Sequence, residues 1–134
     1  MEHVLVVDDD AWKRAIVLEC TRAVLGDGVM IHHASDRFNA EKLFAVYQPR
    51  VIFVDGSFPR SPVGQPESAI GVDFVQRLIH LGYQGIMVAF SGDKEVQARL
   101  VAEGCQYELS PQTMGPEVFE KIFTHAGLLL PGGP

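Results

Sequence analysis

The chain has 134 residues, a length that suits a single domain built around one hydrophobic core. Hydrophobic residues make up 47% and charged residues 21%, which is typical of a globular protein and excludes a disordered chain. The net charge of -6 argues against a nucleic-acid-binding surface, and no apolar run reaches the roughly 18 residues of a membrane span.

The two cysteines, Cys20 and Cys105, lie far apart and have no CxxC spacing, so we expect free thiols. The first apolar stretch is too short for a signal peptide and has no basic leader before it. We therefore expect a cytoplasmic protein.

Five short apolar runs alternate with five amphipathic segments. We expect strands at Val4–Val7, Val29–Ala34, Val51–Val54, Ile86–Phe90 and Cys105–Leu109. The runs are short and do not alternate between apolar and polar residues, which predicts parallel strands that are covered on both faces. The expected fold class is α/β, a flavodoxin-like (βα)5 domain over 1–127 with strand order 2-1-3-4-5. A tail or the start of a linker follows at 128–134.

The amphipathic segments predict helices whose apolar residues face inward. Asp9 or Asp10 can cap the first helix, Asp36 can cap the second, and Pro116 suits the first turn of the last. We expect these inward residues, helix by helix: Trp12, Ile16, Cys20 and Val24; Ala40, Leu43, Phe44 and Tyr47; Val75, Leu78 and Ile79; Val96, Leu100 and Val101; Val118, Phe119, Ile122, Phe123 and Ala126.

Acidic residues directly follow two expected strands, Asp8 to Asp10 after the first and Asp55 after the third. These strands are neighbours in the expected order, so the acids converge on one pocket at the carboxyl edge of the sheet. Two carboxylates ~4 Å apart repel each other by about 4 kcal/mol at an effective dielectric near 20, which favours a bound cation. Helix capping alone is the alternative, and it is the expected role of Asp10.

Other polar residues follow the remaining strands. Ser91 and Ser110 end the fourth and fifth strands and should join the acidic pocket. Ser91 has an ordinary alternative as a turn residue. The stretch between Asp55 and Gly71 is polar, rich in proline and glycine and without periodicity, which predicts a loop.

In combination, these motifs resemble the receiver domain of the bacterial response-regulator family. The resemblance covers nearly the whole chain. It includes the acidic pair in "VLVVDDD", Asp55 with Pro59 four residues on, Ser91 in "AFSG", and Tyr107 ahead of Pro111.

The resemblance implies a site chemistry. Asp8 and Asp9 would bind Mg²⁺, Asp55 would be both a metal ligand and the phosphoacceptor, and the backbone carbonyl of Ser57 would complete the metal site. The metal would neutralise charge on the phosphoryl group during transfer. Asp55 would receive this group from a histidine kinase or a phosphotransfer protein.

The resemblance also implies a switch and an output surface. Ser91 would donate its hydroxyl to a phosphoryl oxygen, and Tyr107 would turn inward as the Ser91 loop moves. A half-buried packing role for Tyr107 stays open. A downstream protein would bind the face formed by helix four, strand five and helix five, and a homodimer stays open. No contact with nucleic acid or membrane is expected.

Two departures from the family pattern stand out. The family's phosphoryl-binding lysine is replaced by Ser110, and Lys13, Arg60 and Lys94 are candidates to supply the missing charge. Proteins of this family can have a cis peptide at the proline that follows, here Pro111. The loop after Asp55 is also unusually long, and it could cover the site, bind a partner or be a solvated insertion.

Three functions follow. The first is a receiver that accepts a phosphoryl group on Asp55 and signals through protein contacts, without being an enzyme. The second is a pseudo-receiver, an interaction module that phosphate does not switch. The third is a small Mg²⁺-dependent phosphohydrolase, which the residue two after Asp55 disfavours because Ser57 is not an acid.

Overall fold

The structure is a computed structural model that describes residues 1–110 and 112–129. It confirms an α/β fold around a five-stranded parallel sheet of order β2-β1-β3-β6-β7, which is 2-1-3-4-5 when only these strands are numbered. The strands are β1 (Glu2–Val7), β2 (Val29–Ala34), β3 (Val51–Val54), β6 (Ile86–Ala89) and β7 (Tyr107–Glu108). The last strand is shorter than expected, since only its two residues pair with β6.

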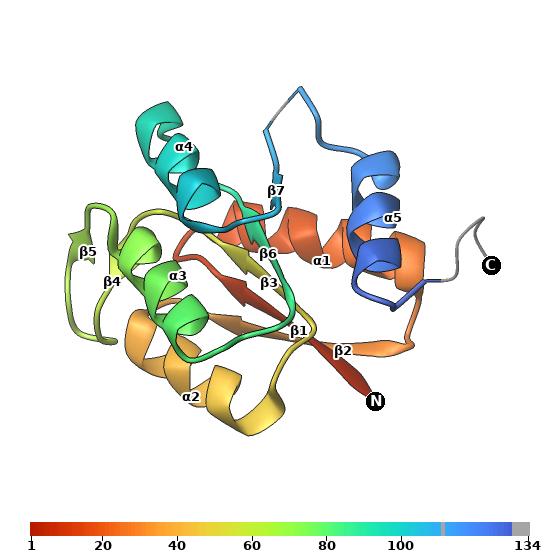
Figure 1. Ribbon diagram of the computed structural model, residues 1–134, viewed down its shortest axis with the longest axis horizontal. Coiled ribbons are helices and arrows are strands. Elements are labelled where there is room, and N and C mark those ends of the chain that lie inside the picture. Colours follow the sequence, from red (N-terminus) through yellow and green to blue (C-terminus); the bar gives the residue numbers. More distant parts are fainter. Residues whose placement is uncertain (111, 130–134) are drawn as a thin grey trace.

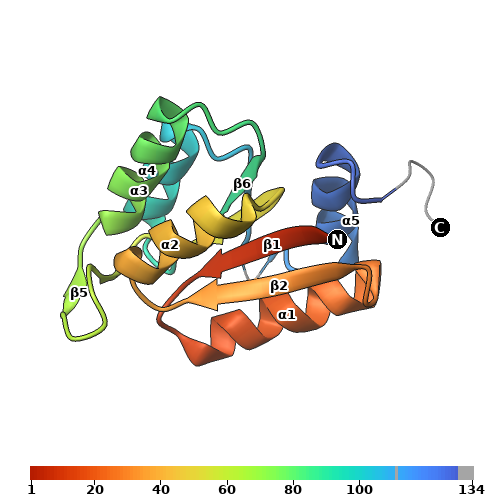
Figure 2. The same cartoon turned by 90° about the horizontal axis from the view of Figure 1, so that it is seen from below.

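Helices cover both faces of the sheet (Figures 1 and 2). One face carries α1 (Ala11–Leu25) and α5 (Pro116–His125), and the other carries α2 (Arg37–Tyr47), α3 (Ile70–His80) and α4 (Lys94–Glu103). Successive residues of a strand therefore enter opposite cores. In β3, Phe53 stacks on Phe119 of α5, whereas Ile52 belongs to the other core. This explains why the central strands are apolar at every position.

Aspartates begin three of the helices. Asp10, Asp36 and Asp93 accept hydrogen bonds from backbone N–H groups in the first turns of α1, α2 and α4. Such caps satisfy donors that have no partner within the helix and typically contribute about 1 kcal/mol each. The predicted capping roles of Asp10 and Asp36 are confirmed.

Several residues predicted to face inward are exposed. Trp12 is 70% exposed, because the buried face of α1 is centred on Val17 and Thr21, one residue further along the helix than Ile16 and Cys20. A shift of one residue rotates the buried face by about 100° around the helix axis. The expectation was also wrong for three residues at the edges of their helices: Tyr47, Ile79 and Val101.

Both cysteines are free thiols, as expected. Burial raises the pKa of the Cys105 thiol to about 12, so this side chain stays protonated and unreactive near neutral pH.

The sequence predicted a loop after Asp55, and this expectation was wrong for part of the segment. That part forms an antiparallel hairpin of β4 (Phe58–Pro59) and β5 (Pro66–Glu67), which lies beside α2 and α3 (Figures 1 and 2). Phe58 is fully buried in the core, and Arg60 forms a bidentate ion pair with Glu67. The Phe38 N–H donates to the Arg60 carbonyl and fixes the hairpin to α2. Phe58 and Val63 are isolated apolar residues within a polar stretch and carry no periodic signal, so the pattern missed this element.

The last described residues, Leu128 and Leu129, pack against the core beside α5. The remainder of the predicted tail, 130–134, lies outside the described residues, as does Pro111 with its predicted cis peptide. In the described part of the chain, no helix combines the length and the apolar character that a membrane crossing requires.

Candidate functional site: an acidic pocket at the carboxyl edge of the sheet

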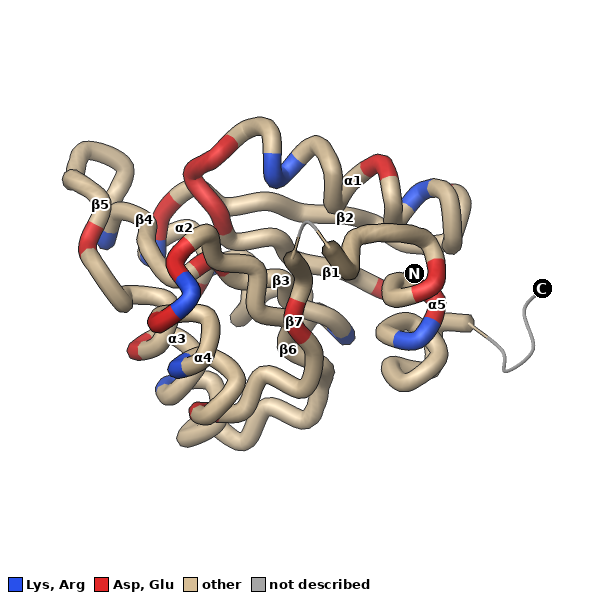
Figure 3. Tube along the Cα trace, turned by 90° about the horizontal axis from the view of Figure 1, so that it is seen from above, with Lys and Arg blue, Asp and Glu red and all other residues tan. Residues whose placement is uncertain are grey.

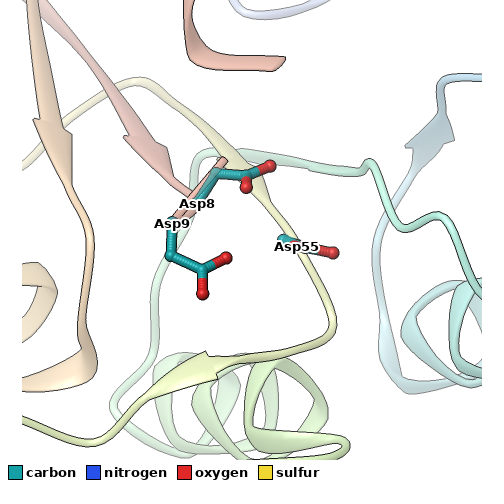
Figure 4. Close-up of side chains that lie close together, drawn as sticks. All are labelled: Asp8, Asp9 and Asp55. Atoms are coloured by element: carbon teal, nitrogen blue, oxygen red, sulfur yellow. The ribbon is translucent and has the colours of Figure 1, made fainter. Parts of the chain in front are cut away.

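The pocket begins where β1 and β3 end. Val7 pairs with Val54 in the sheet, so Asp8 and Asp55 emerge side by side (Figure 4). The Asp55 N–H donates to the Val7 carbonyl at 3.0 Å and continues the strand ladder into the site. Carboxylate oxygens of Asp8, Asp9 and Asp55 lie within 4.8 Å of one another. The structure thus brings together the three acids that the sequence singled out.

The buried carboxylates are electrostatically unfavourable in this position. Burial, and secondly the charge of Asp55, raise the pKa of Asp8 to about 7, although the Asp10 N–H and Lys13 act in the opposite direction. Burial also raises the pKa of Asp55, and Lys13 partly offsets this. The ionised pocket therefore favours a cation. Three clustered carboxylates are also the donor set that suits Mg²⁺, so the residues present fit this ion.

Lys13 lies inside the pocket. Its ammonium nitrogen is 3.2 Å from Asp8 Oδ2 and 3.2 Å from Asp55 Oδ1, and its side chain is 12% exposed. The nitrogen also lies 4.8 Å from the centre of the Phe90 ring, within the range of a cation–π contact. Figure 3 shows the acidic stretch before α1 and, after a short uncharged stretch, basic residues in the first turn of the helix.

The other two candidate cations lie elsewhere. Arg60 is held by Glu67 in the hairpin, and Lys94 lines a groove beside α4. Of the three candidates named from the sequence, the structure places only Lys13 against Asp55.

Gly56 and Ser91 lie beside Asp55 in the pocket. The Gly56 N–H donates to Asp55 Oδ1 at 2.7 Å. A Cβ atom at Gly56 would overlap Val96 and lie 3.1 Å from Ser91 Oγ, so the Ser91 hydroxyl lies directly against the residue after Asp55. Ser91 Oγ also accepts from the Asp93 N–H at 3.2 Å, which gives it the turn role as well.

Gln97 ties the Ser91 turn to the sheet, a role that was not expected from the sequence. Its buried amide accepts from the Ser91 N–H at 2.8 Å and donates to the carbonyls of Ala89 and Leu109. The available signal was a polar residue three positions before Leu100, on the inward face of α4. The amide joins the ends of β6 and β7 beneath the site.

Replacing Gln97 with leucine is expected to lower the free energy of unfolding by about 2–4 kcal/mol, because backbone groups that it satisfies lose their partners. Urea unfolding followed by circular dichroism measures the change. The exposed Gln112 provides the control, since its replacement by leucine should stay within about 0.5 kcal/mol. Equal effects of the two substitutions would contradict a bridging role for Gln97.

Tyr107 and Ser110 form their side-chain hydrogen bonds with residues other than the acids. The Tyr107 hydroxyl forms a hydrogen bond with His125 Nδ1 at 3.1 Å, so this ring is turned toward α5. The Ser110 hydroxyl is 3.1 Å from Thr113 Oγ1. Ser110 therefore does not reproduce the role of a lysine at that position.

A groove of about 660 Å³ runs between α4 and the end of β7. Its walls include Lys94, Gln97, Val101, Glu108 and Ser110. Because Ser91 also lines it, the groove adjoins the acidic pocket.

The fold was compared with known proteins. No family model matches the sequence, and no curated protein is significantly similar to it. A signal receiver domain of a DNA-binding response regulator from Colwellia psychrerythraea 34H is 19% identical, with a TM-score of 0.71, over 93% of this chain and 97% of that one. A response-regulator receiver domain from Bermanella marisrubri is 21% identical, with the same TM-score and coverage. The receiver domain of NtrX from Brucella abortus is 18% identical, with a TM-score of 0.71, over 92% and 96% of the two chains.

Proposed function

We propose that this chain, which has the fold of response-regulator receiver domains, accepts a phosphoryl group on Asp55 and signals through protein contacts. The observation that carries the proposal is the position of Asp55. It ends the central strand, lies next to Asp8 and Asp9, and is backed by the Gly56 N–H. The domain proper is taken as 1–127.

The chain's own groups account for metal binding in this proposal. Asp8, Asp9 and Asp55 would hold Mg²⁺ through carboxylate oxygens, together with the backbone carbonyl of Ser57. When bound, the ion neutralises charge on the phosphoryl group during transfer.

Asp55 acts as the nucleophile. A carboxylate oxygen forms a bond to phosphorus, while the bond to the donor breaks and the donor departs with its electron pair. Because Oδ1 is contacted by Gly56 and Lys13, Oδ2 is the oxygen that we assign to this attack. The donor is a histidine kinase or a phosphotransfer protein. Ser91, whose hydroxyl lies against Gly56, would donate that hydroxyl to the transferred group.

The output surface is formed by α4, β7 and α5. In the proposed switch, the Ser91 turn moves, the bond between Tyr107 and His125 breaks, and the Tyr107 ring turns inward. A downstream protein then binds this face in the cytoplasm. The chain performs no turnover beyond its own phosphorylation and dephosphorylation.

Incubating the protein with Mg²⁺ and acetyl phosphate is expected to add one phosphoryl group, detected by intact mass spectrometry. The adduct should be absent in Asp55→Ala and retained in Asp27→Ala, which removes a fully exposed acid in the turn after α1. Circular dichroism shows that each variant is folded. An unmodified wild-type protein, or an adduct that persists in Asp55→Ala, would refute the proposal.

A second candidate, the interaction module that phosphate does not switch, is favoured by one observation. Ser110 bonds to Thr113 and supplies no cation at the strand end. The same experiment separates the two functions, since the module should remain unmodified.

A further inference from the structure

We propose that Lys13 is a tethered cation that competes with Mg²⁺ for the carboxylates of Asp8 and Asp55. This inference extends the proposed function, because it names the residue that controls metal access to the phosphoacceptor. It concerns the metal-free state, in which the ammonium group neutralises part of the pocket's charge.

The first argument is geometric. Lys13 contacts one oxygen of Asp8 and one of Asp55, each at 3.2 Å. These residues supply two of the three carboxylates in the cluster that fits Mg²⁺. A divalent ion bound there would lie beside the ammonium group and repel it, since like charges this close interact strongly in a partly buried site.

The second argument is that Lys13 is held in place. Asp10 caps α1 and accepts from the Lys13 N–H, which fixes the helix turn that carries the side chain. The ammonium group also lies over Phe90, and little of the side chain is exposed. A side chain ordered in this way loses little further entropy when it binds the acids. The metal therefore competes with an ammonium group that is already in position.

The third argument concerns charge. Three carboxylates and one ammonium leave a formal charge of -2, which a single divalent cation would neutralise. Lys13 therefore need not leave the site when metal binds. It has only to release the oxygens that it contacts.

The test is the Mg²⁺ affinity of the full chain, measured by isothermal titration calorimetry at constant ionic strength. Lys13→Met removes the ammonium group but keeps an unbranched apolar stem, and it is expected to bind Mg²⁺ at least 10-fold more tightly than the wild type. Lys13→Arg should stay within about 3-fold of the wild type, because it keeps the charge.

Lys42→Met is the matched control. Lys42 also lies over an aromatic ring, that of Phe38, at 5.4 Å, but it belongs to α2 and forms none of the pocket's ion pairs. Its loss changes the net charge by the same amount, so an affinity within 2-fold of the wild type would exclude a general charge effect. An unchanged or weaker affinity of Lys13→Met, or no Mg²⁺ binding by either protein, would overturn the inference.

A measurement on the wild-type protein covers the case in which Lys13→Met does not fold. The rate of Lys13 acetylation by an amine-reactive ester, followed by peptide mass spectrometry, should rise at least 3-fold with saturating Mg²⁺. The Lys42 rate should stay constant. An unchanged Lys13 rate would refute displacement.

These outcomes are separate from those of the phosphorylation experiment. Mg²⁺ that competes with Lys13 in a protein that accepts no phosphoryl group would refute the proposed function alone. A phosphorylated wild type whose Mg²⁺ affinity does not respond to Lys13→Met would refute this inference alone.

Discussion

Replacing Gly71 with alanine is expected to lower the free energy of unfolding by at least about 2 kcal/mol and to impair phosphoryl uptake by Asp55. Gly71 is the second residue of α3, where alanine normally stabilises a helix by about 1 kcal/mol relative to glycine. Here the added Cβ would overlap the carbonyl oxygen of Asp55 and lie 2.9 Å from the Gly56 Cα. Both neighbours are backbone, so relief requires α3 to move away from the site.

Urea unfolding and the acetyl phosphate reaction measure the two effects. Gly92→Ala is the control, because a Cβ there meets no atom within 4 Å and the residue is not in the left-handed region. Its stability should stay within about 0.5 kcal/mol of the wild type. A Gly71→Ala protein as stable as the wild type would show that α3 does not approach the Asp55 backbone this closely.

Replacing Phe58 with alanine is expected to lower the free energy of unfolding by about 3–5 kcal/mol, the usual range for a fully buried phenylalanine. Phe58 belongs to β4 of the hairpin and packs in the core between the sheet and α2, α3 and α4. The loss would show that the hairpin is part of the folded core, whereas a solvated insertion would tolerate the change.

Val63→Ala is the matched control at the other end of the hairpin, since its side chain is 94% exposed. It should change the free energy of unfolding by less than about 0.5 kcal/mol. If Phe58→Ala is equally mild in the same urea titrations, the hairpin does not contribute to the core.

The sheet and helices followed from the sequence because their signals are local. Uniformly apolar runs such as Val51–Val54 predicted buried parallel strands, and aspartates such as Asp36 predicted helix starts. The proximity of Asp8 to Asp55 followed from strand order alone, since neighbouring parallel strands end at the same edge.

The sequence named Lys13 as one of three candidate cations near the pocket, but it could not single Lys13 out. A displacement of one residue in the buried face of α1 decides whether Trp12 or Lys13 points toward the acids, and the apolar pattern indicated the wrong face. The polar contacts of Gln97 with Leu109 and of Tyr107 with His125 join different elements. Such pairings depend on packing between elements, which no local spacing encodes.

The hairpin has a further consequence for protein engineering. The Gly71 N–H donates to the Gly56 carbonyl at 2.9 Å. This hydrogen bond joins the two ends of the segment that contains the hairpin. Both ends of the excursion are thereby anchored, and doubling the length of such a closed loop costs only about 0.6 kcal/mol in chain entropy. The tip around Val63 is therefore a natural acceptor site for an epitope or a reporter peptide, displayed from the receiver fold while Asp55 keeps its place.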